Sequence, residues 1–276
     1  MTTRDDLVAR LRVDASDGGQ PYHPYTKWRG AHWRLVSLVE LGVDELDDEL
    51  APQLDRVLDW LSNPSHRRVP VIDGRARRCA SQEGNALWVA CRLGRAHDPR
   101  VAQMAEDLVR WQWPDGGWNC DRSPEASHSS FHESLLPIRG LHAYHEATGE
   151  DTASDAARRA ARFFLDHAII RSHTTGEVAD PQYLKLKWPP YWHHDLLVGL
   201  RIVAEVEPDL EGASRALDDL ESLRGDDGTW RVSGRKWWRA PDSGGSGVEA
   251  VDWTPVADDI VTAQATAVLR GAGRDV

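Results

Sequence analysis

Two kinds of helical pattern alternate along this 276-residue sequence, and the alternation constrains the fold more than any other feature. Four segments carry apolar residues around most of a helical circumference: 25–42, 84–94, 131–144 and 194–203. Each precedes a segment with a single apolar stripe: 48–61, 98–111, 155–167 and 210–223. A helix that is apolar all round is buried, whereas a helix with one apolar stripe faces water on its other side. The pattern therefore predicts an all-α fold of hairpins in which inner and outer helices alternate.

A repeat of about 56 residues indicates how these hairpins are arranged. Two Asp-Gly-x-Trp turns, at 115–118 and 227–230, lie 112 residues apart, which fits two repeats of 56 and nearly five repeats in the chain. Open stacks of hairpins need capped ends. Here segment 258–269 would be a last inner helix, and the short helix at 5–13 would be its outer partner. We therefore predict one domain over 1–276, an α/α toroid of about five hairpins with adjacent termini and no strand pairs.

Charge and cysteine content limit the binding partners of the protein and the cellular compartment in which we expect it. Thirty-three basic against forty-four acidic residues give a net charge of −11, which argues against nucleic acid or an anionic membrane as the main partner. No run approaches the ~20 apolar residues of a membrane span, and the N-terminus has no apolar signal core. Three widely spaced cysteines argue against a disulfide framework, so a reducing cytoplasm is expected.

The first turns of the inner helices bring polar side chains to the centre of the predicted ring. His132–Glu133 and His194–Asp195 are paired at two of these openings. An acid in a first helical turn can be a cap, because free backbone N–H groups there favour an acceptor. A cap does not explain the adjacent imidazole, which titrates near neutral pH and suits acid–base catalysis. We therefore predict catalytic roles for these four residues.

The start of the last helix and the tryptophans supply further candidates. Asp259 follows another aspartate, and because adjacent carboxylates repel, one of them can keep its proton and act as an acid. The chain has thirteen Trp against three Phe. Packing between helices explains most of them, but aromatic faces also stabilise cationic intermediates by ~0.5–2 kcal/mol per contact. The candidates for a substrate-binding cavity wall are Trp28, Glu83, Asn85, Trp192, Trp237, Trp238 and Trp253.

These residues carry a resemblance to a known superfamily. Residues 112–118, Gln-Trp-Pro-Asp-Gly-Gly-Trp, resemble the Gln-Trp repeat of squalene–hopene cyclases, and 227–230 resemble a degenerate copy. The helix openings at 131–134 and 191–195 are similar to inner-helix starts in that superfamily, which includes protein prenyltransferase β-subunits. The resemblance implies an α/α toroid with an aromatic-lined cavity that binds isoprenoid chains. The Asp-x-Asp-Asp acid motif and the Asp-Asp-x-x-Asp magnesium motif of terpenoid cyclases are absent from this sequence.

The resemblance to prenyltransferases also implies a metal site. Those enzymes hold zinc with an Asp, a Cys and a His that opens an inner helix. Here Cys120 follows the Gly-Gly-Trp turn and His132 opens the next helix, while His194 could add a third ligand. Zinc accepts sulfur and nitrogen ligands tetrahedrally, and a catalytic site leaves one position open. Zinc is therefore a candidate cofactor, beside acid–base chemistry that needs no metal, and Cys79 and Cys91 are interpreted as small core residues.

The function favoured by these observations is a terpenoid-cyclase-like enzyme. It would act on an apolar, isoprenoid small molecule by acid–base or metal-assisted chemistry in a central cavity lined by Trp. Two alternatives stay open: a non-catalytic toroid that binds an apolar ligand or a peptide, and a zinc-dependent enzyme similar to prenyltransferases. A cavity filled by Trp side chains would favour the non-catalytic protein. The sequence leaves the oligomeric state open.

Overall fold

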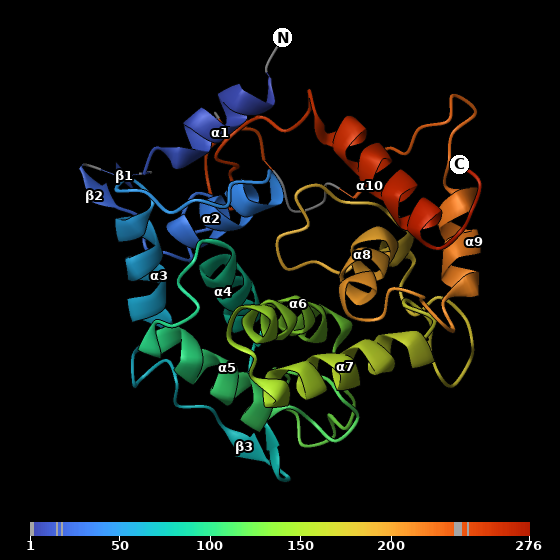
Figure 1. Ribbon diagram of the computed structural model, residues 1–276, viewed down its shortest axis with the longest axis horizontal. Coiled ribbons are helices and arrows are strands. Elements are labelled where there is room, and N and C mark those ends of the chain that lie inside the picture. Colours follow the sequence, from blue (N-terminus) through green and yellow to red (C-terminus); the bar gives the residue numbers. More distant parts are fainter. Residues whose placement is uncertain (1–2, 15, 18, 235–238, 242) are drawn as a thin grey trace.

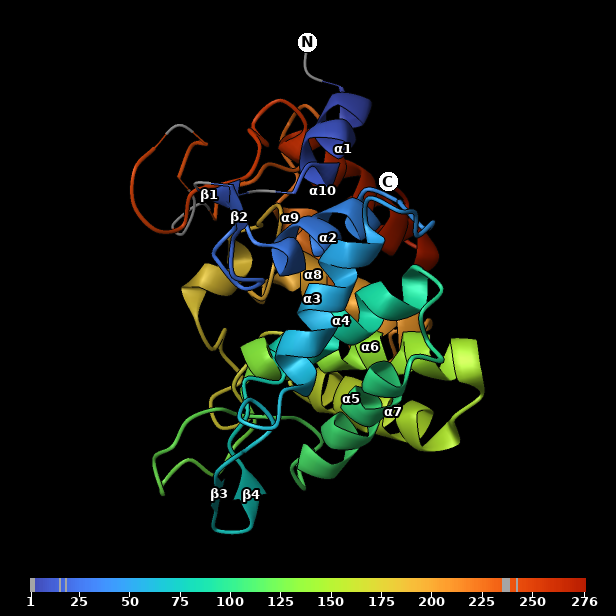
Figure 2. The ribbon, with the colours of Figure 1, turned by 90° about the vertical axis from the view of Figure 1, so that its left-hand side faces the viewer.

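The computed structural model describes residues 3–14, 16–17, 19–234, 239–241 and 243–276 (Figures 1 and 2), and the cavity candidates Trp237 and Trp238 lie outside these ranges. Four helices form an inner group: α2 (Ala31–Glu40), α4 (Ser81–Arg92), α6 (Phe131–Thr148) and α8 (Leu196–Val206). The helices around them are α1 (Arg4–Arg12), α3 (Ala51–Ser62), α5 (Pro99–Trp111), α7 (Asp151–Asp166), α9 (Ser214–Ser222) and α10 (Ala257–Gly271). The predicted all-α class is confirmed.

Burial follows the predicted alternation of inner and outer helices. The inner helix α2 is buried on all sides from Ala31 to Val39. The outer helix α3 instead buries the stripe that its sequence predicts, Leu54, Val57, Leu58 and Leu61, and leaves its other face accessible. Most helical stability in such a fold comes from packing of these apolar faces rather than from helix propensity.

The last helix differs from its prediction as an inner helix. α10 buries Val261, Ala265 and Leu269 on one face and exposes Asp259 and Ala263 on the other, so it resembles the outer helices. It packs against α8 and α9, whereas α1 packs against α2. The closed ring of five hairpins with adjacent termini therefore stays a prediction.

Two helix starts and the strand content also differ from the sequence prediction. The segment expected to be helical from residue 25 becomes helical at Ala31, after Gly30, which lies too close to the Pro24 carbonyl for a side chain. α8 begins at Leu196, because Asp195 is its N-cap. Short antiparallel pairs join β1 (Ser16–Asp17) to β2 (Gln20–Pro21) and β3 (Val71–Ile72) to β4 (Arg75–Ala76). A 3₁₀ helix covers Pro181–Leu184.

The inner helices α4 and α6 meet at two glycines. A Cβ atom on Gly84 would lie 2.4 Å from the backbone nitrogen of Pro137, and a Cβ atom on Gly140 would lie 2.5 Å from the Gly84 carbonyl oxygen. Both distances are too short for real contacts, so this helix crossing requires glycine at both positions. The close approach sets Ser81, at the start of α4, beside Glu133 in the first turn of α6.

The two Asp-Gly-x-Trp turns make the same hydrogen bonds. Each indole N–H donates to the backbone carbonyl ten residues earlier, which lies near the end of the preceding outer helix. The distance is 2.9 Å for Trp118 and 2.8 Å for Trp230. The Trp118 backbone N–H donates to the Ser134 hydroxyl of α6, and the Trp230 backbone N–H donates to the Thr262 hydroxyl of α10. Each turn therefore ties an outer helix to the helix that follows, which supports the predicted internal repeat.

A group of four charges joins three inner helices; the side chains of Arg139 and Glu40 are buried, Arg201 is half-buried and Glu205 is exposed. Arg139 of α6 contacts Glu40 of α2 and Glu205 of α8, and Arg201 of α8 contacts Glu40 at 2.9 Å. The Arg139 guanidinium also lies 4.2 Å from the ring centroid of Trp88 in α4. Burial acts to raise the pKa of Glu40, but the two arginines outweigh it and lower this pKa to about 2. Glu40 is therefore ionised at neutral pH and connects α2 to α6 and α8.

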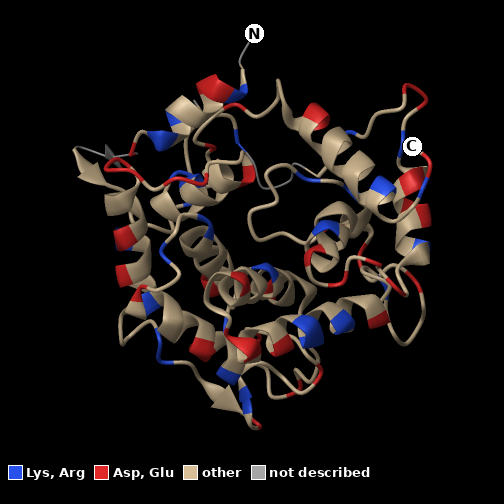
Figure 3. Cartoon of the chain, in the orientation of Figure 1, with Lys and Arg blue, Asp and Glu red and all other residues tan. Residues whose placement is uncertain are grey.

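The outer surface carries charges of both signs. Acidic and basic residues, coloured red and blue, are interspersed along the outer helices (Figure 3). Within the described ranges, no helix combines the length and the apolar character that crossing a lipid bilayer requires. This finding agrees with the sequence, in which no apolar run reaches about 20 residues.

The close approach of α4 and α6 predicts the effect of one added methyl group. Gly84→Ala should lower the free energy of unfolding by about 1–3 kcal/mol, because the new Cβ overlaps the α6 backbone. Urea denaturation followed by circular dichroism measures this change. The matched control is Gly271→Ala in α10, where nothing lies within 4 Å of the added Cβ. The control should be neutral or slightly stabilising, because Ala has the higher helix propensity. Equal effects of the two exchanges would contradict close packing at Gly84.

The buried charges predict a pH-dependent contribution to stability. Glu40→Gln should lower the free energy of unfolding by about 3 kcal/mol at pH 7, because it removes the buried carboxylate that Arg139 and Arg201 share. The pKa of Glu40 is about 2 in the folded chain, against an ordinary value of 4.5. The ionised group therefore stabilises the fold above about pH 4.5, and this contribution is lost as the pH falls toward 2.

The measurement is urea denaturation of both proteins at pH 6 and at pH 3, and the control is Glu106→Gln on the exposed face of α5. The difference between wild type and Glu40→Gln should shrink at pH 3, whereas Glu106→Gln should match wild type at pH 6. A difference for Glu40→Gln that is the same at both pH values would disprove the ionic origin of this stabilisation.

Candidate functional site

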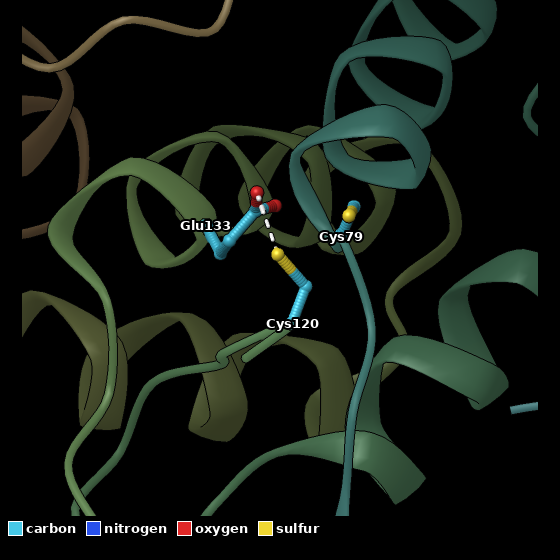
Figure 4. Close-up of side chains that lie close together, drawn as sticks. All are labelled: Cys79, Cys120 and Glu133. Carbon is cyan, nitrogen blue, oxygen red and sulfur yellow. Dashed lines mark hydrogen bonds between the residues drawn. The ribbon is translucent and has the colours of Figure 1, made fainter. Parts of the chain in front are cut away.

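Three residues that could bind a metal gather where α4 and α6 begin. Cys79, Cys120 and Glu133 each offer one ligand atom, and these atoms lie within 4.8 Å of one another. Figure 4 shows the Cys120 thiol directed at the Glu133 carboxylate, with Cys79 on the other side of the thiol. We call these three residues the thiol–carboxylate cluster. Both thiols are half-buried, and Glu133 is buried.

The backbone places the two thiols side by side. Arg77 and Asn119 form a parallel β-bridge, and the Arg78 N–H donates to the Asn119 carbonyl at 3.0 Å. Cys79 follows this pairing on the segment that leads into α4. Cys120 follows it on the loop that leads from the first Asp-Gly-x-Trp turn to α6. The bridge therefore fixes the loop against the start of α4.

Helix α4 orients the carboxylate of the cluster. The Ser81 N–H and the Ser81 hydroxyl both donate to Oε2 of Glu133, at 3.1 and 2.8 Å. The other oxygen, Oε1, accepts from the Cys120 thiol at 3.6 Å. One carboxylate oxygen is thus satisfied by α4, while the second faces the thiols.

The three groups change one another's pKa. Burial raises the pKa of Glu133, and the two hydrogen bonds from Ser81 act against this rise. The hydrogen bond between the thiols lowers the pKa of Cys79 and raises the pKa of Cys120, to which burial and the Glu133 charge also contribute. The hydrogen bond between the thiols therefore favours a thiolate on one sulfur and a protonated thiol on the other.

Further polar residues surround the cluster. Glu83 of α4 contacts Arg78, and its Oε1 lies 3.5 Å from His66 Nε2. Burial acts to raise the pKa of Glu83, but His66 and Arg78 lower it below its ordinary value. Burial raises the pKa of Tyr25, and the charges of Glu83 and of the cluster raise it further. Tyr25 therefore keeps its phenolic proton at neutral pH. Glu83, predicted as a cavity residue, is held in an ion pair.

His132, the residue before Glu133, belongs to a second group that we call the histidine cluster, consisting of His132, Trp192, His193 and His194. The rings of Trp192 and His193 stack with centroids 4.1 Å apart, and the ring of His132 meets Trp192 edge-on at 5.3 Å. The His194 backbone N–H donates to His132 Nδ1 at 2.9 Å, so the neutral His132 ring carries its proton on Nε2. Burial lowers the pKa of His132 to about 4 and that of His193 to about 3.

His194 and Asp195, two of the predicted catalytic residues, have structural partners. The His194 ring is buried, and its Nε2 lies 3.1 Å from the Ile169 carbonyl oxygen. Asp195 accepts from the backbone N–H groups of Val198 at 3.0 Å and of Lys187 at 2.9 Å. The first of these bonds makes Asp195 the N-cap of α8. The cap interpretation considered for this acid therefore accounts for its position.

Asp259, the fifth predicted catalytic residue, is exposed in the first turn of α10. Its neighbour Asp258 accepts from the Val232 backbone N–H at 2.8 Å and contacts Arg231 at 3.5 Å. The two aspartates therefore do not share one buried site, which was the condition for one of them to act as an acid.

Several predicted cavity residues are packed into the protein interior. Trp28 is 1% exposed, and its ring stacks on Tyr191 with centroids 4.2 Å apart. Trp253 is 2% exposed. The side-chain amide of Asn85 donates to the Tyr191 carbonyl at 3.1 Å. Trp192, which is half-buried, is more accessible than these three residues. The protein's own groups therefore fill much of the space that the sequence assigns to a substrate.

The predicted zinc ligands do not form one group. Cys120 lies with Cys79 and Glu133, whereas His132 and His194 belong to the histidine cluster. Consecutive residues point about 100° apart on a helix, so the first turn of α6 sends its imidazole and its carboxylate to different clusters. Cys79, interpreted from the sequence as a core residue, is the member of the thiol–carboxylate cluster that the prediction missed. No local sequence signal marks it, because its position beside Cys120 depends on the bridge between two distant segments.

Burial of the histidine cluster predicts the protonation state of His132. Its pKa of about 4 lies below the ordinary value of 6.5, so His132 should stay neutral at pH 5, whereas the same residue in the unfolded chain takes up a proton. Stability linked to this group is present above about pH 6.5 and is lost as the pH falls toward 4. NMR titration of histidine-labelled protein measures the pKa, and a His132→Asn spectrum assigns the signal. A His132 midpoint near 6.5 would contradict the burial described here.

Comparisons of this chain with protein-family models, with curated proteins and with solved structures found no match. The resemblance to squalene–hopene cyclases and prenyltransferases therefore stays a prediction. Two features of this chain carry it: the Gln-Trp-type repeat at 112–118, and the second turn at 227–230, which makes the same hydrogen bonds as the first.

Proposed function

We propose that this chain is a metal-dependent enzyme of the terpenoid-cyclase-like kind, with zinc bound by Cys79, Cys120 and Glu133. The convergence of these three side chains is the observation that carries the proposal. It keeps the metal-assisted chemistry expected from the sequence and changes two of the three ligands.

The geometry of the thiol–carboxylate cluster suits a tetrahedral metal. Zinc bonds of about 2.3 Å to sulfur and about 2.0 Å to oxygen would place those two ligand atoms about 3.5 Å apart. The Cys120 sulfur and Glu133 Oε1 are already 3.6 Å apart. Two sulfur ligands favour zinc over magnesium or calcium, which prefer oxygen. Three protein ligands leave a fourth position open, as in catalytic zinc sites.

The surroundings of the cluster also suit a metal ligand. Ser81 occupies Oε2 of Glu133 with two hydrogen bonds and leaves Oε1 directed at the thiols. Such secondary contacts orient metal ligands and fix the oxygen that binds. A positive ion would also compensate the charge of a buried carboxylate, whose pKa is raised by burial in the metal-free chain.

Bound zinc would supply Lewis-acid chemistry or an activated nucleophile at the open position. The chain's own residues would then hold and orient the reactants. Tyr25 keeps its proton at neutral pH, and the charges that raise its pKa include Glu133 and Cys79. Its hydroxyl is thus available as a hydrogen-bond donor on the α2 side of the cluster. The expectation of an apolar, isoprenoid substrate comes from the family resemblance alone.

A second candidate function is non-catalytic binding. Trp28, Tyr191 and Trp253 are each at most 2% exposed, so the aromatic residues expected around a substrate pack against the protein itself. This packing favours a protein that binds an apolar ligand or a peptide by rearrangement or at its surface. In that case the metal would be structural, and its removal would unfold the chain rather than stop turnover.

Elemental analysis of the purified protein tests the metal centre. Wild type loaded with zinc and freed of excess should retain about one zinc per chain. Cys79→Ser and Cys120→Ser should each lose most of it, because a hydroxyl is a poor zinc ligand. Cys91→Ser is the matched control, since it also removes a half-buried thiol but lies outside the cluster. Wild type that retains no zinc, or a Cys91→Ser variant that loses it as well, would reject this site.

Incubation with isoprenoids separates the two functions. Zinc-loaded wild type and Cys120→Ser are each mixed with isoprenoid diphosphates and with neutral polyprenes. The enzyme proposal expects a new product by mass spectrometry with wild type and not with Cys120→Ser. Thermal stabilisation of both proteins by one of these compounds, without any product, would support the binding protein instead.

A further inference from the structure

The two thiols of the thiol–carboxylate cluster are also placed to react with each other. The Sγ atoms of Cys79 and Cys120 lie within 4.8 Å, and a disulfide bond requires about 2.05 Å. Hydrogen-bonded neighbouring chains lie about 4.8 Å apart, and a disulfide joins Cα atoms about 4.4–6.8 Å apart. The bridge between Arg77 and Asn119 lies two residues before Cys79 and one residue before Cys120, and it holds the two segments that carry the thiols side by side.

The same backbone pairing favours this reaction over others that the cysteines could undergo. Arg78 and Asn119 are joined by a hydrogen bond of 3.0 Å, so the two thiols stay together without a large movement of the loop. Both thiols are half-buried, which leaves them accessible to a small oxidant. The third thiol, Cys91, is in the last turn of α4, at the end of the helix remote from Cys79.

We propose that Cys79 and Cys120 form a reversible disulfide when the protein meets a peroxide, and that this bond replaces the metal. A peroxide oxidises one thiol to a sulfenic acid, and its second oxygen leaves as water. The other thiol then attacks the sulfenic sulfur, the S–S bond forms, and the hydroxyl group leaves as water with the thiol proton. Two thiols lose two electrons and two protons in total, and hydrogen peroxide is reduced to two water molecules.

The disulfide would control the proposed function. It removes both sulfur ligands at once and leaves Glu133 as a single carboxylate, which does not retain zinc. A dithiol reductant would restore the thiols and the metal site. The loss of metal rests on the proposed zinc centre, whereas the pairing of the two thiols does not.

The test combines thiol counting with zinc release. Wild type and Cys91→Ser, each zinc-loaded, are treated with hydrogen peroxide, alkylated with N-ethylmaleimide and weighed as intact chains. Since the chain has three cysteines, wild type should go from three alkylated thiols to one, and Cys91→Ser from two to none. A chromogenic chelator should detect about one zinc released per disulfide formed. Dithiothreitol should restore the original thiol count, and peptide mapping should link Cys79 to Cys120.

Oxidation of the metal-free protein separates this inference from the metal centre. A disulfide in a chain that never retained zinc would support the thiol pairing and reject the zinc centre. Retained zinc with three alkylated thiols after peroxide would reject the disulfide and leave the zinc centre standing. A bond that includes Cys91 or joins two chains would also overturn the inference. So would a disulfide that forms in the metal-free protein but not in the zinc-loaded one.

Discussion

The close approach of α4 and α6 at Gly84 and Gly140 is the contact on which the candidate site depends. With a side chain at either glycine, the two helices would separate. Ser81 would then no longer reach Glu133, and the start of α4 would move away from the loop that carries Cys120. The positions of the reactive side chains at the starts of α4 and α6 therefore depend on packing at Gly84 and Gly140. Substitution far from a reactive group can displace it in this way, because packed interiors transmit strain.

Ion pairs between α2, α6 and α8 add a second set of contacts between the inner helices. Glu40 pairs with both Arg139 and Arg201, and the exposed Glu205 gives Arg139 a second partner, so each buried charge of the group has a partner of opposite sign. Its ion pairs join α2 and α8 to α6, whose first turn carries His132 and Glu133, one residue of each cluster. A buried ion pair contributes little net stability but defines which helices lie together. The glycine contact thus sets the distance between α4 and α6, and the ion pairs favour the placement of α2 and α8 beside α6.

Much of the fold could be predicted from the sequence, because burial of one helix face or of all faces determines the spacing of apolar residues. The stripe of α3 was read correctly for this reason. α10 was assigned to the inner group from its place in the alternating order, after the outer segment 210–223, rather than from its own pattern, and its exposed Asp259 and Ala263 show one accessible face. The pairing of Cys79 with Cys120 has no effect on that spacing. It depends on the bridge between their neighbouring segments, and a pairing between distant segments has no local sequence signal.

The two Asp-Gly-x-Trp turns make the same hydrogen bonds, but different residues follow them. Both anchor an indole to the carbonyl ten residues before it and a backbone N–H to a hydroxyl of the next helix. After the first turn the chain continues with Asn119 and Cys120, and after the second with Arg231 and Val232. The hydrogen bonds of the turn do not involve the Cys120 thiol. A repeated architecture of this kind leaves the residue two places beyond each tryptophan free to diverge, so that one copy can acquire reactivity while the other only supports the fold.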